Sequence, residues 1–190
     1  MKILKTTITL LLMVVSFGAF AKKDKPATMI KQEIIIDASI DKAWEVLGPQ
    51  FGNAQIWASS IKHSEALNEE SINGSNCTER GCSVAGMGEI KEVLLSYSPE
   101  NHSISYEVKE GLPKMVRYAS NNWQLIDLGN GKTKLISQIE MKTGGFMGWM
   151  MGGMMKKKMT KMSSEVVEEF KYYIENGSPH PRTIKSNAKS

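Results

Sequence analysis

Cysteine and histidine are scarce in this chain, which has two cysteines and three histidines in 190 residues. A metal site built from these side chains needs three or four ligands at a recognisable spacing, and His63 and His102 offer no such spacing to Cys77 and Cys82. The serine-hydrolase motif G-x-S-x-G and the zinc-protease motif H-E-x-x-H are absent from the sequence. We therefore expect no metal, no cofactor and no hydrolytic site of these types.

An excess of charge of one sign is also missing. The chain has 24 basic and 20 acidic residues, for a formal net charge of +4. Binding to DNA or RNA requires a larger basic surplus that is gathered on one face. We therefore expect no nucleic acid partner.

Long apolar runs are absent after the first 21 residues. The run from Thr6 to Phe20 follows Lys2 and Lys5 and ends at the A-x-A site of residues 19–21, as in a secretory signal peptide. It is shorter than the roughly 20 residues that cross a bilayer. We expect residues 1–21 to be a signal peptide, followed by a polar leader over residues 22–30, and the protein to be exported: periplasmic in a bacterium, secreted otherwise.

Export to an oxidising compartment makes a disulfide between Cys77 and Cys82 plausible. Two residues that are five apart on a flat strand point to opposite faces, so the bridge requires a turn or bulge, which Gly81 could supply. The disulfide is expected on grounds of compartment, and it fails if this stretch is a regular strand.

The remaining sequence predicts an antiparallel sheet that is followed by one long helix. Strand patterns recur between turn residues, at residues 31–37, 61–67, 78–84, 89–97, 103–109, 116–128 and 133–143. Two short helices are predicted between the first two strands, over residues 39–47 and 51–59. A long helix over residues 144–176 carries an apolar stripe. Together these elements indicate an α+β domain whose last helix packs on the concave face of a curved sheet.

Several short motifs in this order resemble those of the START-like (Bet v 1-like, SRPBCC) superfamily, and in particular its polyketide cyclase/dehydrase and lipid transport group. They are Ile34 to Ser39 leading into Ala43 to Leu47, Phe51-Gly52 with Trp57, Gly88 to Glu92 leading to Tyr97 to Glu100, Ser105-Tyr106, Leu112-Pro113 and Gly131 to Thr133. The resemblance implies a helix-grip fold, with a seven-stranded antiparallel sheet, two short helices after the first strand and a hydrophobic cavity beneath the last helix. We assign the START-like domain to residues 31–176 and expect a disordered tail over residues 177–190.

Two positions matter for what the resemblance implies. Arg80 stands where many relatives carry an arginine that enters the cavity, although the flanking cysteines could redirect it. Ser137 replaces a large apolar residue of many relatives, which would enlarge the cavity or add a polar contact.

Methionines dominate the long helix between Met147 and Met162. Methionine is flexible and polarizable, so this stripe suits a deformable wall around an apolar ligand, with Gly148, Gly152 and Gly153 making room for it. Ordinary core packing explains the stripe equally well. A third interpretation is Cu(I) or Ag(I) binding, because soft thioethers select these ions and Met-x-x-Met recurs in the helix.

The lysines at positions 156, 157, 158 and 161 lie in the same helix. Next to the methionines they could attract anionic lipid headgroups in a weak contact with a membrane surface. The alternative is a solvated helix face, which is the usual role of such a run.

Strand alternation and the family resemblance together indicate which side chains line the cavity. The candidates are Trp57, Arg80, Glu92, Tyr106, Tyr118, Trp123, Ser137, Trp149, Met150 and Met154. Arg80 and Glu92 could act on a substrate, or could form an internal pair that satisfies itself. We expect a monomeric carrier of a hydrophobic small molecule or lipid; the alternative is a cyclase- or dehydratase-like enzyme that uses the same cavity.

Overall fold

The computed structural model describes residues 27–188. Its elements, in chain order, are β1 (Thr28–Ile36), α1 (Ile40–Leu47), the 3-10 helix η1 (Phe51–Ile56), β2 (Ile61–Ala66), β3 (Glu79–Val84), β4 (Gly88–Ser98), β5 (Ser103–Glu110), β6 (Val116–Gly129), β7 (Lys132–Thr143), α2 (Gly145–Asn176) and α3 (Pro181–Asn187). The expected signal peptide lies outside the described residues. The expected polar leader is shorter than predicted, because β1 already begins at Thr28.

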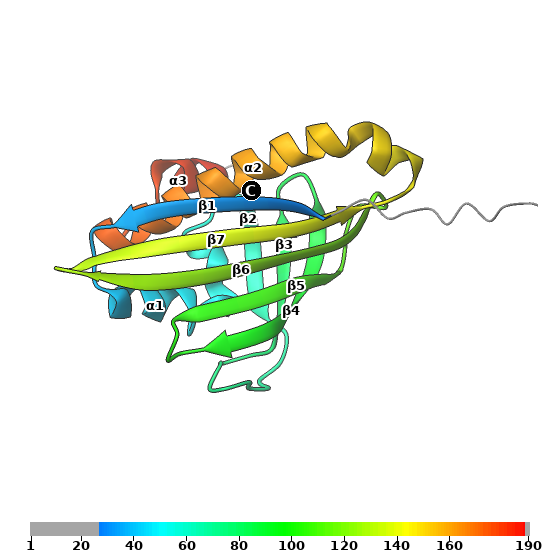
Figure 1. The fold of residues 1–190 in the computed structure, drawn as a ribbon. Coiled ribbons are helices and arrows are strands. Elements are labelled where there is room, and N and C mark those ends of the chain that lie inside the picture. Colours follow the sequence, from blue (N-terminus) through cyan, green and yellow to red (C-terminus); the bar gives the residue numbers. More distant parts are fainter. Residues whose placement is uncertain (1–26, 189–190) are drawn as a thin grey trace, which may run out of the picture.

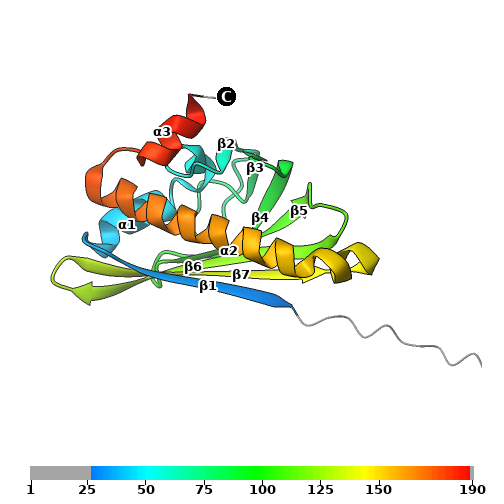
Figure 2. The same ribbon diagram turned by 90° about the horizontal axis from the view of Figure 1, so that it is seen from above.

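The seven strands form one antiparallel sheet in the order β1-β7-β6-β5-β4-β3-β2. Consecutive strands from β2 to β7 pair with each other, β2 and β3 across the long loop of residues 67–78 and the others across short turns. Strand β1 pairs with β7 from Thr28↔Met141 to Ile36↔Thr133. The sheet curves around α2, which runs along its concave side, as Figures 1 and 2 show. The predicted α+β helix-grip fold is confirmed.

Alternation along the strands creates the core between the sheet and α2. On β7 the buried positions are Thr133, Leu135, Ser137, Ile139 and Met141, each two residues from the next. A regular strand turns such a set toward one face. At the centre of the core, the rings of Trp57 and Trp123 both contact Phe170 of α2, with centroids 5.1 and 5.7 Å away.

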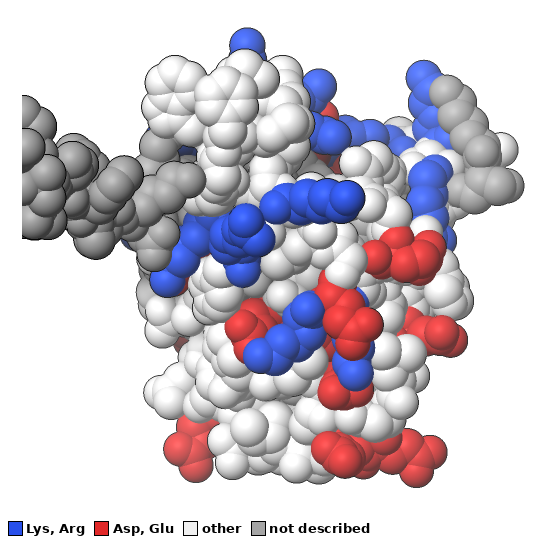
Figure 3. Space-filling model, turned by 90° about the vertical axis from the view of Figure 1, so that its right-hand side faces the viewer, with Lys and Arg blue, Asp and Glu red and all other residues white. Residues whose placement is uncertain are grey.

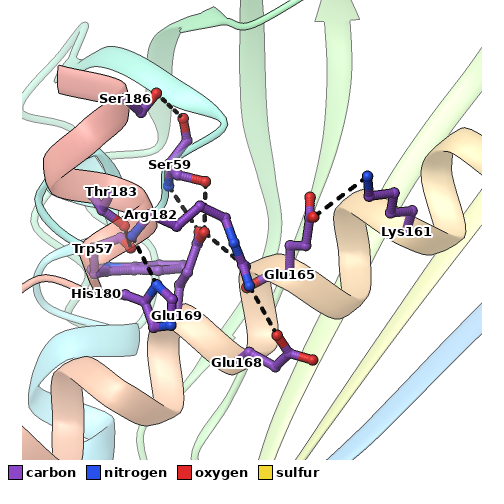
Figure 4. Close-up of polar contacts among 10 residues, drawn as sticks. All are labelled: Trp57, Ser59, Lys161, Glu165, Glu168, Glu169, His180, Arg182, Thr183 and Ser186. Atoms are coloured by element: carbon purple, nitrogen blue, oxygen red, sulfur yellow. Dashed lines mark hydrogen bonds and ion pairs between the residues drawn. The ribbon is translucent and has the colours of Figure 1, made fainter. Parts of the chain in front are cut away.

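Residues 181–187 form the helix α3, which corrects the expectation of a disordered tail over residues 177–190 for the part of it that the structure describes. Pro181 occupies the first turn of α3, and His180 caps it by accepting a hydrogen bond from the Arg182 amide. Figure 4 shows α3 against α2 and the segment before β2. Thr183 donates to the Trp57 carbonyl at 2.9 Å and Arg182 pairs with Glu169 at 3.0 Å. These long-range contacts order a segment whose composition alone is typical of disorder.

The first turns of helix α2 lie at one end of the sheet (Figure 1). Phe146 and Trp149 in these turns are mostly exposed, whereas Phe170 and Ile174 in the later part of the helix are fully buried. The core therefore covers the later part of α2 more fully than its beginning. No helix among residues 27–188 combines the length and apolar character needed to cross a bilayer.

Candidate ligand cavity

A cavity of about 150 Å³ lies between the concave face of the sheet and α2. Its wall is mostly apolar, with contributions from η1, from strands β3 to β7 and from α2. A cavity of this size and character accommodates one aromatic ring of the size of benzene. A larger guest requires the side chains of the wall to move.

Arg80 and Glu92 form a buried ion pair in this wall. They are directly opposite each other on β3 and β4, so both side chains emerge on the concave face. Arg80 Nε donates to Glu92 Oε2 at 2.8 Å, and Nη2 donates to the same oxygen. The remaining nitrogen, Nη1, donates to the Phe51 carbonyl at 2.7 Å. Within the described chain, each of the three guanidinium nitrogens thus donates to a protein acceptor.

Aromatic rings complete the surroundings of Arg80. Its guanidinium carbon lies 4.0 Å from the centroid of Phe51 and 5.0 Å from that of Tyr106. Burial alone would lower the pKa of Arg80, but the Glu92 carboxylate outweighs this effect and keeps the pKa above its ordinary value. Burial, with the same carboxylate nearby, raises the pKa of Tyr106 to about 12. The cavity therefore holds a permanent cation with its counterion and a neutral phenol.

Asn121 extends the polar side of the cavity from β5 to β7. It donates to the Tyr106 hydroxyl at 3.3 Å and accepts from Ser137 Oγ at 3.2 Å. The sequence analysis did not identify Asn121. The signal was present, because Asn121 is two residues from Trp123 and alternation turns both toward the same face.

Trp57 and Trp123 carry the unpaired polar atoms of the site. Both side chains line the cavity, and both indole Nε1 atoms are buried without a hydrogen-bond partner in the described structure. A buried donor without a partner costs free energy, about 1–3 kcal/mol. An acceptor on a guest that reaches these atoms would remove this cost.

The structure brings together six of the ten candidate residues at the cavity wall. These are Trp57, Arg80, Glu92, Tyr106, Trp123 and Ser137. The helix contributes Met155, Met159 and Met162 to the wall, so the methionine wall exists but is displaced along α2 from the predicted positions.

Trp149, Met150 and Met154 were predicted to line the cavity, and this prediction is wrong. Their side chains are 65%, 60% and 61% exposed, in the part of α2 that extends toward the end of the sheet. Helical periodicity identifies a face of the helix but not how far along its length that face is covered.

The glycines of α2 do not make room for a guest either. A Cβ atom on Gly148 would lie 3.1 Å from Thr143 Cβ and 3.3 Å from the Met115 carbonyl oxygen, so this glycine allows the helix to approach the ends of two strands. Gly152 and Gly153 lie outside the cavity wall.

Tyr118 also lies outside the cavity, which corrects its assignment. Tyr118 and Trp123 are five residues apart on β6, so a strand cannot turn both toward one face. The Tyr118 ring instead contacts Lys142, whose Nζ lies 5.1 Å from the centroid of the ring.

Cys77 and Cys82 are both buried as free thiols, so the expected disulfide is not formed. Cys82 lies within the regular strand β3, packs with Val84 and Ile90, and donates to Glu92 Oε2 at 3.5 Å. Cys77 precedes the strand and belongs to the main core. The Gly81 bulge that the bridge requires is absent from the pairing of β3 with β4.

Acidic, histidine and cysteine side chains do not assemble into a metal site of three or more ligands anywhere in residues 27–188. The thioether alternative, Cu(I) or Ag(I) at the methionines of α2, stays a prediction.

Comparison with known proteins places the whole domain in one group. The family model for polyketide cyclase/dehydrase and lipid transport matches residues 27–175. A comparison with curated proteins gave no match. Solved structures of the START and Bet v 1-like type share the fold.

Three of these structures illustrate the similarity. A START superfamily protein from Mycobacterium smegmatis has a TM-score of 0.65 at 15% identity, covering 79% of this chain and 99% of its own. Truncated norcoclaurine synthase from Thalictrum flavum has a TM-score of 0.63 at 15% identity, covering 80% and 95%. The ZhuI aromatase/cyclase from Streptomyces sp. R1128 has a TM-score of 0.60 at 19% identity, covering 82% and 100%.

Proposed function

Because the chain belongs to the polyketide cyclase/dehydrase and lipid transport family, we propose that it is an exported carrier of an apolar small molecule or lipid that bears a hydroxyl or carbonyl oxygen. Proteins of this superfamily bind hydrophobic ligands, and some of them are cyclases. The observation that carries the proposal is the apolar cavity whose wall includes Trp57 and Trp123, because the buried indole N–H groups of these two residues have no partner in the described structure.

The apolar wall supplies most of the binding free energy in this account. Burial of apolar surface contributes about 25 cal/mol per Å², and a few polar groups then fix the orientation of the ligand. The indole N–H groups of Trp57 and Trp123 donate to the ligand oxygen. Because these N–H groups have no partner within the described protein, they favour a ligand with an acceptor over a pure hydrocarbon.

Methionine side chains account for the difference between a small cavity and a larger ligand. Met155, Met159 and Met162 form most of the helix side of the wall, together with Ser163 and Val166. Each has three rotatable bonds, so the wall can repack around guests of different shape without moving the sheet. The carrier hypothesis thus requires only side-chain motion.

Fluorescence titration with a series of alcohols and the hydrocarbons of matching length tests this proposal. Trp57→Phe and Trp123→Phe should each weaken the binding of alcohols by up to about tenfold and leave the binding of hydrocarbons unchanged. Trp44→Phe is the matched control, because Trp44 packs on Tyr97 outside the cavity. If no alcohol binds, or if Ala119→Phe in the cavity wall has no more effect than Ala188→Phe on the surface, the proposal fails.

Catalysis in the same cavity is the second candidate function. The observation in its favour is the group of Arg80, Glu92 and Tyr106 at one wall, and two structures with the same fold are named as a synthase and an aromatase/cyclase. The pairing of Glu92 with Arg80 weighs against a free base, and the raised pKa of Tyr106 keeps it a hydrogen-bond donor. A Tyr106→Phe variant that loses turnover but keeps its affinity would favour catalysis.

A further inference from the structure

The beginning of α2 exposes a group of large apolar side chains, here named the apolar tip. Its members and their exposed fractions are Phe146 71%, Met147 51%, Trp149 65%, Met150 60% and Met154 61%. The rings of Phe146 and Trp149 lie with centroids 6.0 Å apart. Single exposed apolar residues are ordinary, but a contiguous group of this kind marks an interaction surface.

Four exposed lysines accompany the tip, here named the lysine band: Lys114, Lys156, Lys157 and Lys158. Lys156 to Lys158 follow Met154 in α2. Lys114 precedes Met115, whose carbonyl accepts from the Gly144 amide at the start of that helix at 2.9 Å. None of the four forms an ion pair within the part of the chain that the structure describes, whereas Lys161, the next lysine of α2, pairs with Glu165 at 3.8 Å.

Figure 3 views the molecule from this end. Uncharged atoms project at the top, Lys and Arg atoms gather around and directly below them, and most Asp and Glu atoms lie in the lower half. The charged side chains next to the apolar projection are therefore mainly basic, whereas basic and acidic side chains are mixed in the lower half of this face.

We propose that the apolar tip and the lysine band together form a docking surface for an anionic lipid bilayer. Aromatic side chains favour the boundary between headgroups and acyl chains. Lysines near the surface are attracted to negatively charged headgroups. The insertion of apolar side chains and the attraction of a basic cluster each bind a membrane only weakly. Stable binding of a peripheral protein requires both contributions.

The charge of the lysine band argues against a second copy of the chain as the occupant. A two-fold contact through the apolar tip brings the same surface of both copies together. The unpaired lysines of each copy then lie near those of the other. An anionic bilayer instead neutralises them.

The docking surface adjoins the cavity. At this end of the fold the cavity wall includes Met87, Leu112, Pro113 and Met155, all of them partly exposed. The lysine band lies near the same part of the wall. Lys158 Nζ is 3.2 Å from the position that a Cβ atom on Gly86 would take, and Gly86 is the neighbour of Met87 in the chain. Docking would thus bring this wall of the cavity next to the bilayer.

Co-sedimentation with vesicles tests the proposal. The chain starting at Lys22 is suitable, because the buried core begins at Ile30 and keeps all its described contacts. It should bind vesicles of phosphatidylcholine with phosphatidylglycerol, bind pure phosphatidylcholine far more weakly, and lose binding at high salt. The emission of exposed Trp149 should shift to the blue on binding.

Matched variants separate the two contributions. The variant K156Q/K157Q/K158Q should weaken binding to anionic vesicles by about 100-fold, whereas K42Q/K185Q, with exposed lysines elsewhere, should not. F146S/W149S should abolish sedimentation, whereas I126S/L128S, with exposed apolar residues on the β6–β7 hairpin, should retain it.

Three outcomes would overturn the proposal: no sedimentation with anionic vesicles, equal binding to neutral vesicles, or a dimer in analytical ultracentrifugation that F146S/W149S dissociates while vesicles remain unbound. Alcohol titration of F146S/W149S should match the unaltered chain, so a failure of docking is distinguishable from a failure of the cavity hypothesis.

Discussion

Arg80 and Glu92 face each other across the β3–β4 ladder, and their charges neutralise one another inside the wall of an apolar cavity. Both side chains are almost fully buried, at 5% and 9% exposure. A paired charge leaves the cavity electrically balanced, so an uncharged guest can enter it without meeting an isolated ion.

Glu92→Gln should destabilise the fold strongly, because it leaves the Arg80 guanidinium buried without a counterion. Loss of one partner of a buried pair costs about 3–5 kcal/mol, measured as the free energy of unfolding in urea. The double variant Arg80→Met/Glu92→Leu should recover most of this loss, since apolar replacement of both partners is often neutral. A single variant as stable as the unaltered protein would contradict the buried pairing.

Stability should fall at alkaline pH through Cys82 and Tyr106. Burial raises the pKa of the Cys82 thiol from 9.0 to about 12, and that of the Tyr106 phenol from 10.0 to about 12. The pKa of each group is higher in the folded state than in the unfolded state, so folding favours the neutral form. The contribution of these groups to the free energy of unfolding is therefore fully present below about pH 9 and is lost between about pH 9 and 12.

Thermal unfolding between pH 7 and 11 measures this effect. Cys82→Ala and Tyr106→Phe should each reduce the fall in stability, whereas Ser83→Ala, a neighbour without a titrating side chain, should not.

The two cysteines should be free thiols in solution. Both should react with an alkylating agent in denaturant without prior reduction. An alkylation that requires a reductant would restore the disulfide hypothesis.

Replacement of Met155, Met159 and Met162 by leucine should narrow the range of ligands. Leucine has similar volume, so the fold should lose little stability, less than about 1.5 kcal/mol per site. It has fewer rotatable bonds, so the wall repacks less readily and long-chain alcohols should bind more weakly while compact aromatic alcohols bind as before. The control is Met147→Leu on the exposed tip. An equal loss of affinity for long-chain and for compact aromatic alcohols would count against a deformable wall.

Arg182→Ala should loosen α3 and destabilise the protein. Glu169 is fully buried and accepts from the amide and hydroxyl of Ser59, at 2.8 and 2.6 Å, as well as from Arg182. Removal of the partly exposed arginine should cost about 2 kcal/mol, below the usual range for a fully buried pair, and lower the melting temperature by about 4–8 °C.

Lys185→Ala removes an exposed cation from the same helix and serves as the control for Arg182→Ala. Calorimetry of the two variants separates a docked helix from a disordered tail. Equal melting temperatures would show that α3 does not contribute to the fold in solution.

The strands and α2 could be predicted from the sequence because turn residues and alternation are local signals. The inward placement of Arg80, Glu92 and Ser137 followed from the same alternation. Tyr118 is an odd number of residues from Trp123, so the same rule places it on the opposite face of the strand, outside the cavity.

The remaining features depend on long-range contacts. No local pattern in the sequence predicts which part of α2 the sheet covers. Met150 and Met159 therefore have similar sequence surroundings, but Met150 is exposed and Met159 lines the cavity. The start of α3 at His180-Pro181 is a local pattern that favours a helix. The packing of α3 on the domain depends instead on the buried Glu169 carboxylate, which accepts hydrogen bonds from Ser59 and Arg182 in distant segments of the chain.

Native mass spectrometry of the chain purified from its own host, followed by extraction of any bound compound, tests the central claim most directly. The account predicts one apolar molecule with a hydroxyl or carbonyl oxygen per chain, which is lost or reduced in Ala119→Phe and retained in Ala188→Phe. A copper adduct that disappears when Met150, Met151 and Met154 become leucine, with no organic guest, would contradict it.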